Sequence, residues 1–134
     1  MPCSKDGDEY VLNGTKCFIT NGGIADIYTV AASTSPELGS AGISLFIVDR
    51  NTPGVSVGKE EDKLGIRTSN TTDVIFQDVR IPATNLIGEE NKGFAISQKL
   101  LARTRPTGMA SALGVAQRHW IWQLTTHSRE LLLE

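Results

Sequence analysis

The stretch that decides the fold is EYVLNGTKCFITNGG, residues 9–23. Two runs of alternating character flank Asn13-Gly14, a dipeptide that tolerates the positive φ angles of a type I′ turn. The twist of that turn matches the strands that it joins, so the stretch predicts an antiparallel hairpin centred on Asn13-Gly14. Turn residues at positions 21–23 predict that the second strand ends just after Thr20. This leaves the Phe18 ring and the Thr20 hydroxyl on one face near a sheet edge, where they can receive a flat ligand.

Short strands separated by turns continue along the chain up to Pro82. The β-branched and aromatic runs are residues 26–32, 43–48, 55–57, 72–76 and 79–81. Pro82 ends the last of them because proline cannot donate to a β-ladder. The first eight residues are mostly polar, with a turn at residues 6–8, so we expect the fold to begin near Glu9. Strands this short and regular indicate an antiparallel β-sandwich or barrel.

The composition changes after Pro82. A charged loop at residues 85–93 precedes a helix that is predicted to begin at Phe94 and to continue to the C-terminus. Pro106 is expected to kink this helix unless the local geometry compensates. The predicted division is a β-domain over residues 1–84 and a helical segment over residues 85–134. Nothing in the chain is large enough to pack along the whole helix, which predicts a fragment or a partner-dependent piece.

Length and composition restrict the class of protein. The chain has 134 residues, about one domain, with 40% hydrophobic and 21% charged residues. A net charge of -2 offers no global attraction to nucleic acid. No run approaches the length of a membrane-spanning helix, and the N-terminus lacks the apolar core of a signal peptide. We therefore expect a soluble intracellular protein with no nucleic-acid partner and no membrane span.

The metal-ligating residue types are sparse. Cys3 and Cys17 are the only cysteines and form no CxxC pair, so idle or buried thiols are expected, with a disulfide between them left open. His119 and His127 lie eight residues apart, and no third ligand stands at metal spacing. The sequence predicts no metal site.

Seven ordered motifs resemble the acyl-CoA dehydrogenase family. They are Asn13-Gly14-Thr15-Lys16, Phe18-Ile19-Thr20-Asn21-Gly22, Phe46-Ile47-Val48, Thr52-Pro53-Gly54, Gly65-Ile66-Arg67, Phe76-Gln77-Asp78-Val79-Arg80-Ile81-Pro82 and Gly88-Glu89-Glu90-Asn91-Lys92-Gly93-Phe94. So many matches in the family's order are far more specific than a lone motif. The resemblance extends from residue 7 to residue 118. It implies the middle β-domain of that family, followed by the first helix of the C-terminal helical domain.

The resemblance also implies a chemistry and its site residues. The parent enzyme is FAD-dependent and carries out α,β-dehydrogenation of an acyl-CoA thioester, with hydride transfer to flavin N5 while a glutamate removes the α-proton. Phe18 takes the position of an aromatic residue, often Trp, that packs on the isoalloxazine. Thr20 takes that of a hydroxyl that hydrogen-bonds near N5. Ile19, between them, is expected to contact the cofactor as well. Arg105 matches an arginine beside the bound acyl-CoA.

Some positions depart from the family pattern. Family members commonly carry an Asp three residues before that arginine, where this chain has Ala102. Some family members place the catalytic glutamate immediately before that arginine, where this chain has Thr104. In most members the catalytic base comes from a later loop, which would lie beyond Glu134. We therefore expect no catalytic residue here and a fragment that is inactive alone, although its enzyme status stays open. For the full-length enzyme the resemblance implies an acyl-CoA substrate, an electron acceptor and a homo-oligomer.

The segment after Arg118 departs further. Where the family expects a helix of the kind Ala-Leu-Asp-Leu-Ala, this chain has residues 119–124, HWIWQL. Suitable codons for these residues, read one nucleotide earlier, encode the expected segment, which suggests a local frameshift and a second departure at residues 131–134. The coding DNA decides this hypothesis. The alternative function is a non-catalytic β-domain that acts as an interaction or assembly module, with Trp120 and Trp122 at its contact surface.

Overall fold

The computed structural model describes the backbone of residues 1–130 and the side chains of residues 1–126. The elements, in chain order, are β1 (Cys3–Asp6), β2 (Glu9–Thr20), β3 (Ile27–Ser33), the 3₁₀ helix η1 (Pro36–Gly42), β4 (Ile43–Asp49), β5 (Val55–Glu60), β6 (Thr71–Pro82), the 3₁₀ helix η2 (Ala83–Asn85) and α1 (Gly93–Glu130). The chain divides into two compact units, the first over residues 1–96 and the second beginning at Ser97. The predicted boundary after residue 84 stays a prediction.

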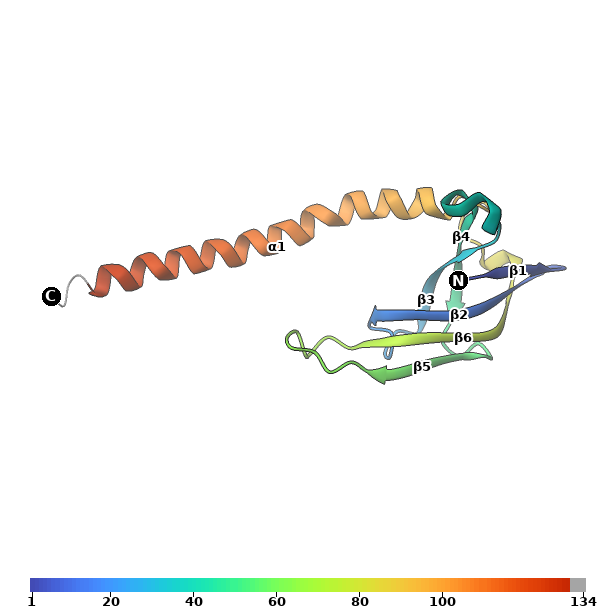
Figure 1. The fold of residues 1–134 in the computed structure, drawn as a ribbon, viewed down its shortest axis with the longest axis horizontal. Coiled ribbons are helices and arrows are strands. Elements are labelled where there is room, and N and C mark those ends of the chain that lie inside the picture. The colour runs from blue at the N-terminus through green and yellow to red at the C-terminus, as the bar shows by residue number, and fades with distance from the viewer. Residues whose placement is uncertain (131–134) are drawn as a thin grey trace. The chain divides into compact units, whose positions relative to one another are not determined.

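The first unit consists of two antiparallel sheets (Figure 1). One sheet has four strands in the order β1-β2-β6-β5, and the other pairs β3 with β4. Figure 1 shows β3 and β4 running across the strands of the larger sheet. The predicted antiparallel β-sandwich followed by a long helix is confirmed.

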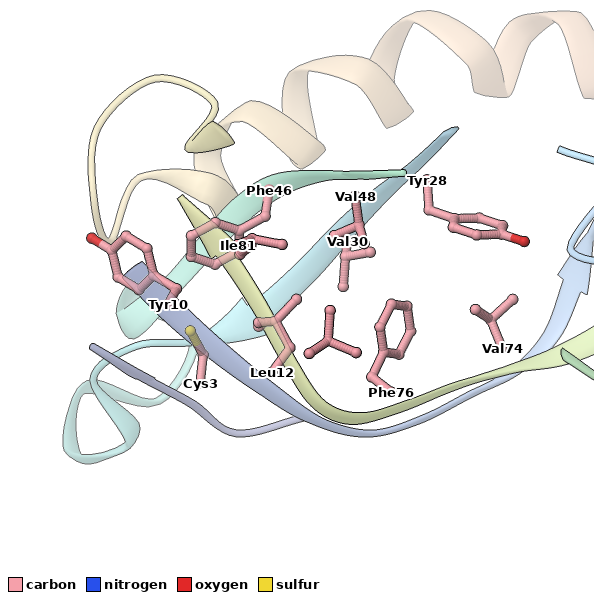
Figure 2. Packing of buried hydrophobic residues seen from close by; sticks show 12 residues of the cluster. Cys3, Tyr10, Leu12, Tyr28, Val30, Phe46, Val48, Val74, Phe76 and Ile81 are labelled. Carbon is pink, nitrogen blue, oxygen red and sulfur yellow. The ribbon is translucent and has the colours of Figure 1, made fainter. Parts of the chain in front are cut away.

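The hydrophobic core of this unit lies between the two sheets (Figure 2). The ring centroids of Tyr10 on β2 and Phe46 on β4 are 4.8 Å apart, with the planes tilted by 53°. Tilted aromatic pairs of this kind stabilise a core beyond the area that they bury. The buried cluster comprises Cys3, Tyr10, Leu12, Tyr28, Val30, Ala32, Phe46, Val48, Val74, Phe76, Val79 and Ile81.

The prediction of a hairpin turn at Asn13-Gly14 is wrong. Strand β2 runs through this dipeptide without turning. The hairpin instead joins β1 to β2 through Gly7 and Asp8, so the fold begins with β1 and not near Glu9 as expected. Gly7 has a φ of +60° in the first loop position, where a type II′ turn favours glycine.

Asn13 forms part of a β-bulge. It faces two residues of β6, Gln77 and Asp78, so one extra residue is inserted into β6. Asn13 Oδ1 accepts a hydrogen bond from the backbone N–H of Asp78 at 2.8 Å, and Asn13 Nδ2 donates to Asp78 Oδ1 at 2.9 Å. Asp78 adopts a φ of +49°. The two short strands predicted at 72–76 and 79–81 are therefore one strand, β6, interrupted by this bulge.

The start of α1 is anchored on β4. A Cβ on Gly93 would lie 2.7 Å from the carbonyl carbon of Ser44, so only glycine permits this approach. Asn91 accepts a hydrogen bond from Thr34 Oγ1 at 2.8 Å, and its backbone N–H donates to Ser44 Oγ at 2.8 Å. From Gly93 the helix is continuous through Pro106. The helices of the described residues include none with the length and hydropathy to cross a bilayer.

Candidate flavin-facing site at the end of strand β2

A second bulge shapes the end of β2. Cys17 and Phe18 together face a single residue of β6, Asp73, so β2 carries the extra residue here. Phe18 adopts a φ of +55°, in the left-handed region that non-glycine residues seldom occupy. The Phe18 backbone N–H, which the bulge removes from the ladder, donates to Asp73 Oδ1 at 3.2 Å. Asp73 thus stabilises a strained conformation at a predicted site residue.

The bulge also changes which face of the sheet Phe18 occupies. Strict alternation from the buried residues Tyr10 and Leu12 would turn Phe18 toward the core. The extra residue shifts the alternation by one, so that Ile19 packs against the core and Phe18 stays 71% exposed. A large aromatic ring is thereby presented to solvent on a rigid strand.

The turn after Thr20 is fixed by close packing and hydrogen bonds. Asn21 donates its backbone N–H to the carbonyl of Asn70 at 2.8 Å, and the buried Tyr28 hydroxyl donates to the carbonyl of Gly22 at 2.7 Å. A Cβ at Gly22 would lie 3.0 Å from Thr72 Cγ2. The predicted strand end after Thr20 is confirmed, and the turn holds that end of the strand in place.

The three predicted cofactor contacts therefore lie together. Phe18 and Thr20 are exposed, and Ile19 between them is half-buried and packs against the core cluster. An exposed ring offers a π surface to a flat heteroaromatic group, and a hydroxyl at the strand end offers both a donor and an acceptor. The residues present thus fit one side of an isoalloxazine ring.

Asp73 also has the largest effect on the neighbouring Cys17 thiol. Its negative charge raises the pKa of the exposed Cys17 thiol, with smaller contributions from desolvation, a hydrogen bond to Asp73 and the charge of Glu61. The Cys17 thiol is therefore held in its neutral form. Both cysteines are free, with Cys3 buried in the core and Cys17 on the surface. Within the described range, no group of three or more metal-ligating side chains is found.

Lys16 was not singled out by the sequence. It lines a cavity of about 250 Å³ together with Ile19 and Thr20. Desolvation by burial lowers the pKa of its ammonium group. The available signal is the alternation from the buried residues Tyr10 and Leu12, which turns Lys16 toward the core. The cavity itself depends on the opposite sheet, because Ile27, Tyr28 and Val30 of β3 form part of its lining.

The remaining predicted residues lie on α1. Arg105 is exposed in the second unit, so its predicted role rests on the resemblance alone. Thr104 donates its hydroxyl to the carbonyl of Leu100 at 3.2 Å and offers no carboxylate. Trp120 and Trp122 are 63% and 58% exposed. The side chain of His127 and residues 131–134 lie outside the described part of the chain.

Comparison with known proteins identifies the family to which this chain is similar. Residues 2–79 match the family model described as acyl-CoA dehydrogenase, middle domain. Cyclohexane-1-carbonyl-CoA dehydrogenase of Syntrophus aciditrophicus (strain SB) is 49% identical over 126 residues, which cover 94% of this chain and 33% of that protein. This chain thus spans about a third of the length of the first curated relatives that it matches.

Two solved structures are similar in both sequence and fold. Butyryl-CoA dehydrogenase from Megasphaera elsdenii is 53% identical with a TM-score of 0.72, over 74% of this chain and 26% of that one. An FAD-dependent dehydrogenase is 44% identical with a TM-score of 0.69, over 71% of this chain and 26% of that one. At these identities the match concerns the family as well as the fold.

Proposed function

We propose, because this chain belongs to the acyl-CoA dehydrogenase family, that its β unit is the flavin-facing middle domain of an FAD-dependent acyl-CoA dehydrogenase. The parent reaction is α,β-dehydrogenation of an acyl-CoA thioester. The observation that carries the proposal is the bulge at Cys17-Phe18, which exposes an aromatic ring beside a strand-terminal hydroxyl. Bulges commonly re-aim side chains next to active sites.

The residues have separate tasks in this proposal. Phe18 packs on one face of the isoalloxazine, Thr20 hydrogen-bonds at its polar edge, and Ile19 ties the strand to the core between them. Bound flavin supplies the hydride acceptor. The backbone of Phe18 is held by Asp73 before any ligand arrives, so little ordering is needed on binding. Arg105 is proposed to lie beside the acyl-CoA in the complete enzyme.

We also propose that this chain does not catalyse the dehydrogenation alone. Thr104 stands immediately before Arg105, and a threonine hydroxyl is too weak a base to remove an α-proton. The chain spans about a third of the length of its first curated relatives. We propose that the remaining flavin and substrate contacts lie in the rest of the complete enzyme. The acyl-CoA substrate, the electron acceptor and a homo-oligomeric state are proposals for the complete enzyme.

Flavin titration of the ¹⁵N-labelled chain tests the site. Excess FAD should shift the amide resonances of Phe18, Ile19 and Thr20 first, with weak affinity, and little colour should survive gel filtration. Phe18→Ala should reduce these shifts several-fold, because it removes the stacking surface. Leu64→Ala, at a fully exposed apolar residue of another loop, is the matched control and should leave them unchanged.

Two results would count against the proposal in different ways. Shifts that avoid residues 18–20 would refute the site. Tight stoichiometric FAD that bleaches with acyl-CoA would refute the proposed inactivity and leave the site intact.

A second candidate function is a non-catalytic interaction module, which the exposure of Trp120 and Trp122 favours. Large exposed aromatic residues are common anchors of protein interfaces. Under this alternative, FAD leaves the resonances of residues 18–20 unchanged, and the Trp120→Ala/Trp122→Ala double variant loses association with its partner while the β unit remains folded.

A further inference from the structure

A cavity of about 250 Å³ lies at one end of the core, between β2, β3 and β6. Figure 2 shows Val74 and Phe76 on one side of this end and Tyr28 on the other, far from Tyr10. Ile19 and Thr20 line the cavity and Phe18 does not, so the cavity adjoins the ring surface described above without including the ring.

Lys16 is the one charged residue among those that line this cavity. It is half-buried, and burial lowers the pKa of its ammonium group. Among the described residues, none forms a hydrogen bond or an ion pair with that ammonium. A partly desolvated cation without a partner is unfavourable, and an anion beside it would recover the lost interaction.

The cavity limits the size of such an anion. A dry cavity of about 150 Å³ accepts a benzene molecule, and drug-sized ligands occupy sites of about 300 Å³ or more. A volume of about 250 Å³ therefore suits a benzene-sized body that carries one small charged group. Its lining is mainly apolar, including Ile19, Val30 and Phe76, which excludes a multiply charged ligand such as a nucleotide.

We propose that this cavity is a binding site for a small monocarboxylate, whose carboxylate pairs with Lys16 and whose apolar body packs against Ile19, Ala25 and Ile27, the accessible apolar side chains of the lining. The site lies wholly within the first unit. Ile19 and Thr20 belong to both sites, but the test below uses no flavin and reads the Lys16 charge, so its failure is distinguishable from the failure of the function proposed above.

Benzoate and its neutral analogue benzamide test the role of the charge. Titration of the ¹⁵N-labelled full chain should give saturable shifts at Lys16, Thr20 and Tyr28, with benzoate bound about tenfold more tightly than benzamide, as expected for one charge-assisted contact. Lys16→Met keeps a similar length and should remove this preference. Lys59→Met removes the same charge from an exposed position on β5 and should preserve it.

A second variant tests the cavity itself. Ala25 lines it and is half-buried, so Ala25→Leu should fill part of the space and weaken both ligands several-fold. If the amide resonances of Lys16→Met lose the dispersion of a folded protein, Lys16→Gln is used in its place. Equal affinity for benzoate and benzamide, an unchanged preference in the Lys16 variant, or no saturable shift at millimolar concentration would each overturn the proposal.

Discussion

At the scale of single residues, two bulges shape the pairing of β2 with β6. Asn13 holds the first through two hydrogen bonds to Asp78, and Asp73 holds the second through the backbone N–H of Phe18. Each bulge contains a non-glycine residue at positive φ, Asp78 in the first and Phe18 in the second. Such conformations persist only where neighbouring groups hold them.

Removing the Asn13 side chain should weaken the first bulge. Asn13→Ala loses both hydrogen bonds and should lower the free energy of unfolding by about 1 kcal/mol, since the groups are exposed and water replaces part of the loss. Asn13→Asp should cost more at pH 7, because it removes a donor and places a second carboxylate beside Asp78. Urea denaturation measures the free energy of unfolding of both variants.

The matched control is Asn51→Ala. The Asn51 side chain is exposed, and among the described contacts only its backbone N–H is used, toward Asp49. The free energy of unfolding of the Asn51→Ala variant should equal that of the parent chain. An Asn13→Asp variant as stable at pH 7 as at pH 3, relative to the parent chain, would contradict the charge argument.

At the scale of elements, β2 and α1 differ in what supports them. β2 pairs with β1 on one side and β6 on the other, and its inward side chains enter the core. From Gln98 to Thr125, the side chains of α1 are exposed, including Leu100, Met109 and Leu113. Isolated helices depend on tertiary packing for most of their stability, so α1 should open locally more readily than the sheets.

Limited digestion with trypsin should show this difference. The first cuts are expected after Lys99, Arg103 or Arg118, which lie on the exposed helix. A product that retains the β unit should persist at least tenfold longer than the intact chain. Mass spectrometry of the products over time identifies the sites.

Arg80 provides the internal control. It is about half exposed, but it lies within β6 and pairs with Asp6 at 2.9 Å and Glu9 at 3.1 Å. Cleavage after Arg80 should require global unfolding. A first cut in the β5–β6 loop, at Lys63 or Arg67, would show that α1 opens less readily than this loop and would contradict the prediction.

At the scale of the whole molecule, stability should fall in alkaline solution. Burial and Glu90 raise the pKa of Cys3 from 9.0 to about 11, and burial and the hydrogen bond to Glu90 raise that of Tyr10 from 10.0 to about 12. Both groups are neutral when protonated, so folding favours the protonated form. Their contribution is complete below pH 9 and is lost between about pH 9 and pH 12. The lowered pKa of Lys16 opposes this trend.

Chemical denaturation from pH 7 to pH 11 measures the fall. Tyr10→Phe keeps the ring but removes the titrating hydroxyl and its 2.9 Å bond to Glu90. The variant should be less stable at pH 7 and should lose stability less steeply above pH 10. If the free energy of unfolding of Tyr10→Phe falls with pH as steeply as that of the parent chain, Tyr10 is excluded as a source of the effect.

Much of this fold could be predicted from local patterns. The strands at 26–32 and 43–48, the strand end after Thr20, the ladder end at Pro82 and the helix start near Phe94 follow from alternation and turn residues. The Asn13-Gly14 prediction failed because a turn and a bulge use the same residues. A pairing partner far away in sequence, residues 77 and 78, selects the bulge.

The sequence by itself determined the family, the antiparallel β class and the identity of Phe18, Ile19 and Thr20 as candidate contacts, because ordered motifs and short-range periodicity are local properties of the chain. The tertiary structure decided that Phe18 is exposed, that Ile19 faces the core and that Lys16 lines a cavity. The first two outcomes depend on one inserted residue opposite Asp73, and the third depends on β3, which supplies part of the cavity lining. The physical reason is that a bulge shifts the side-chain alternation of a strand by one, and only the register with the neighbouring strand places it.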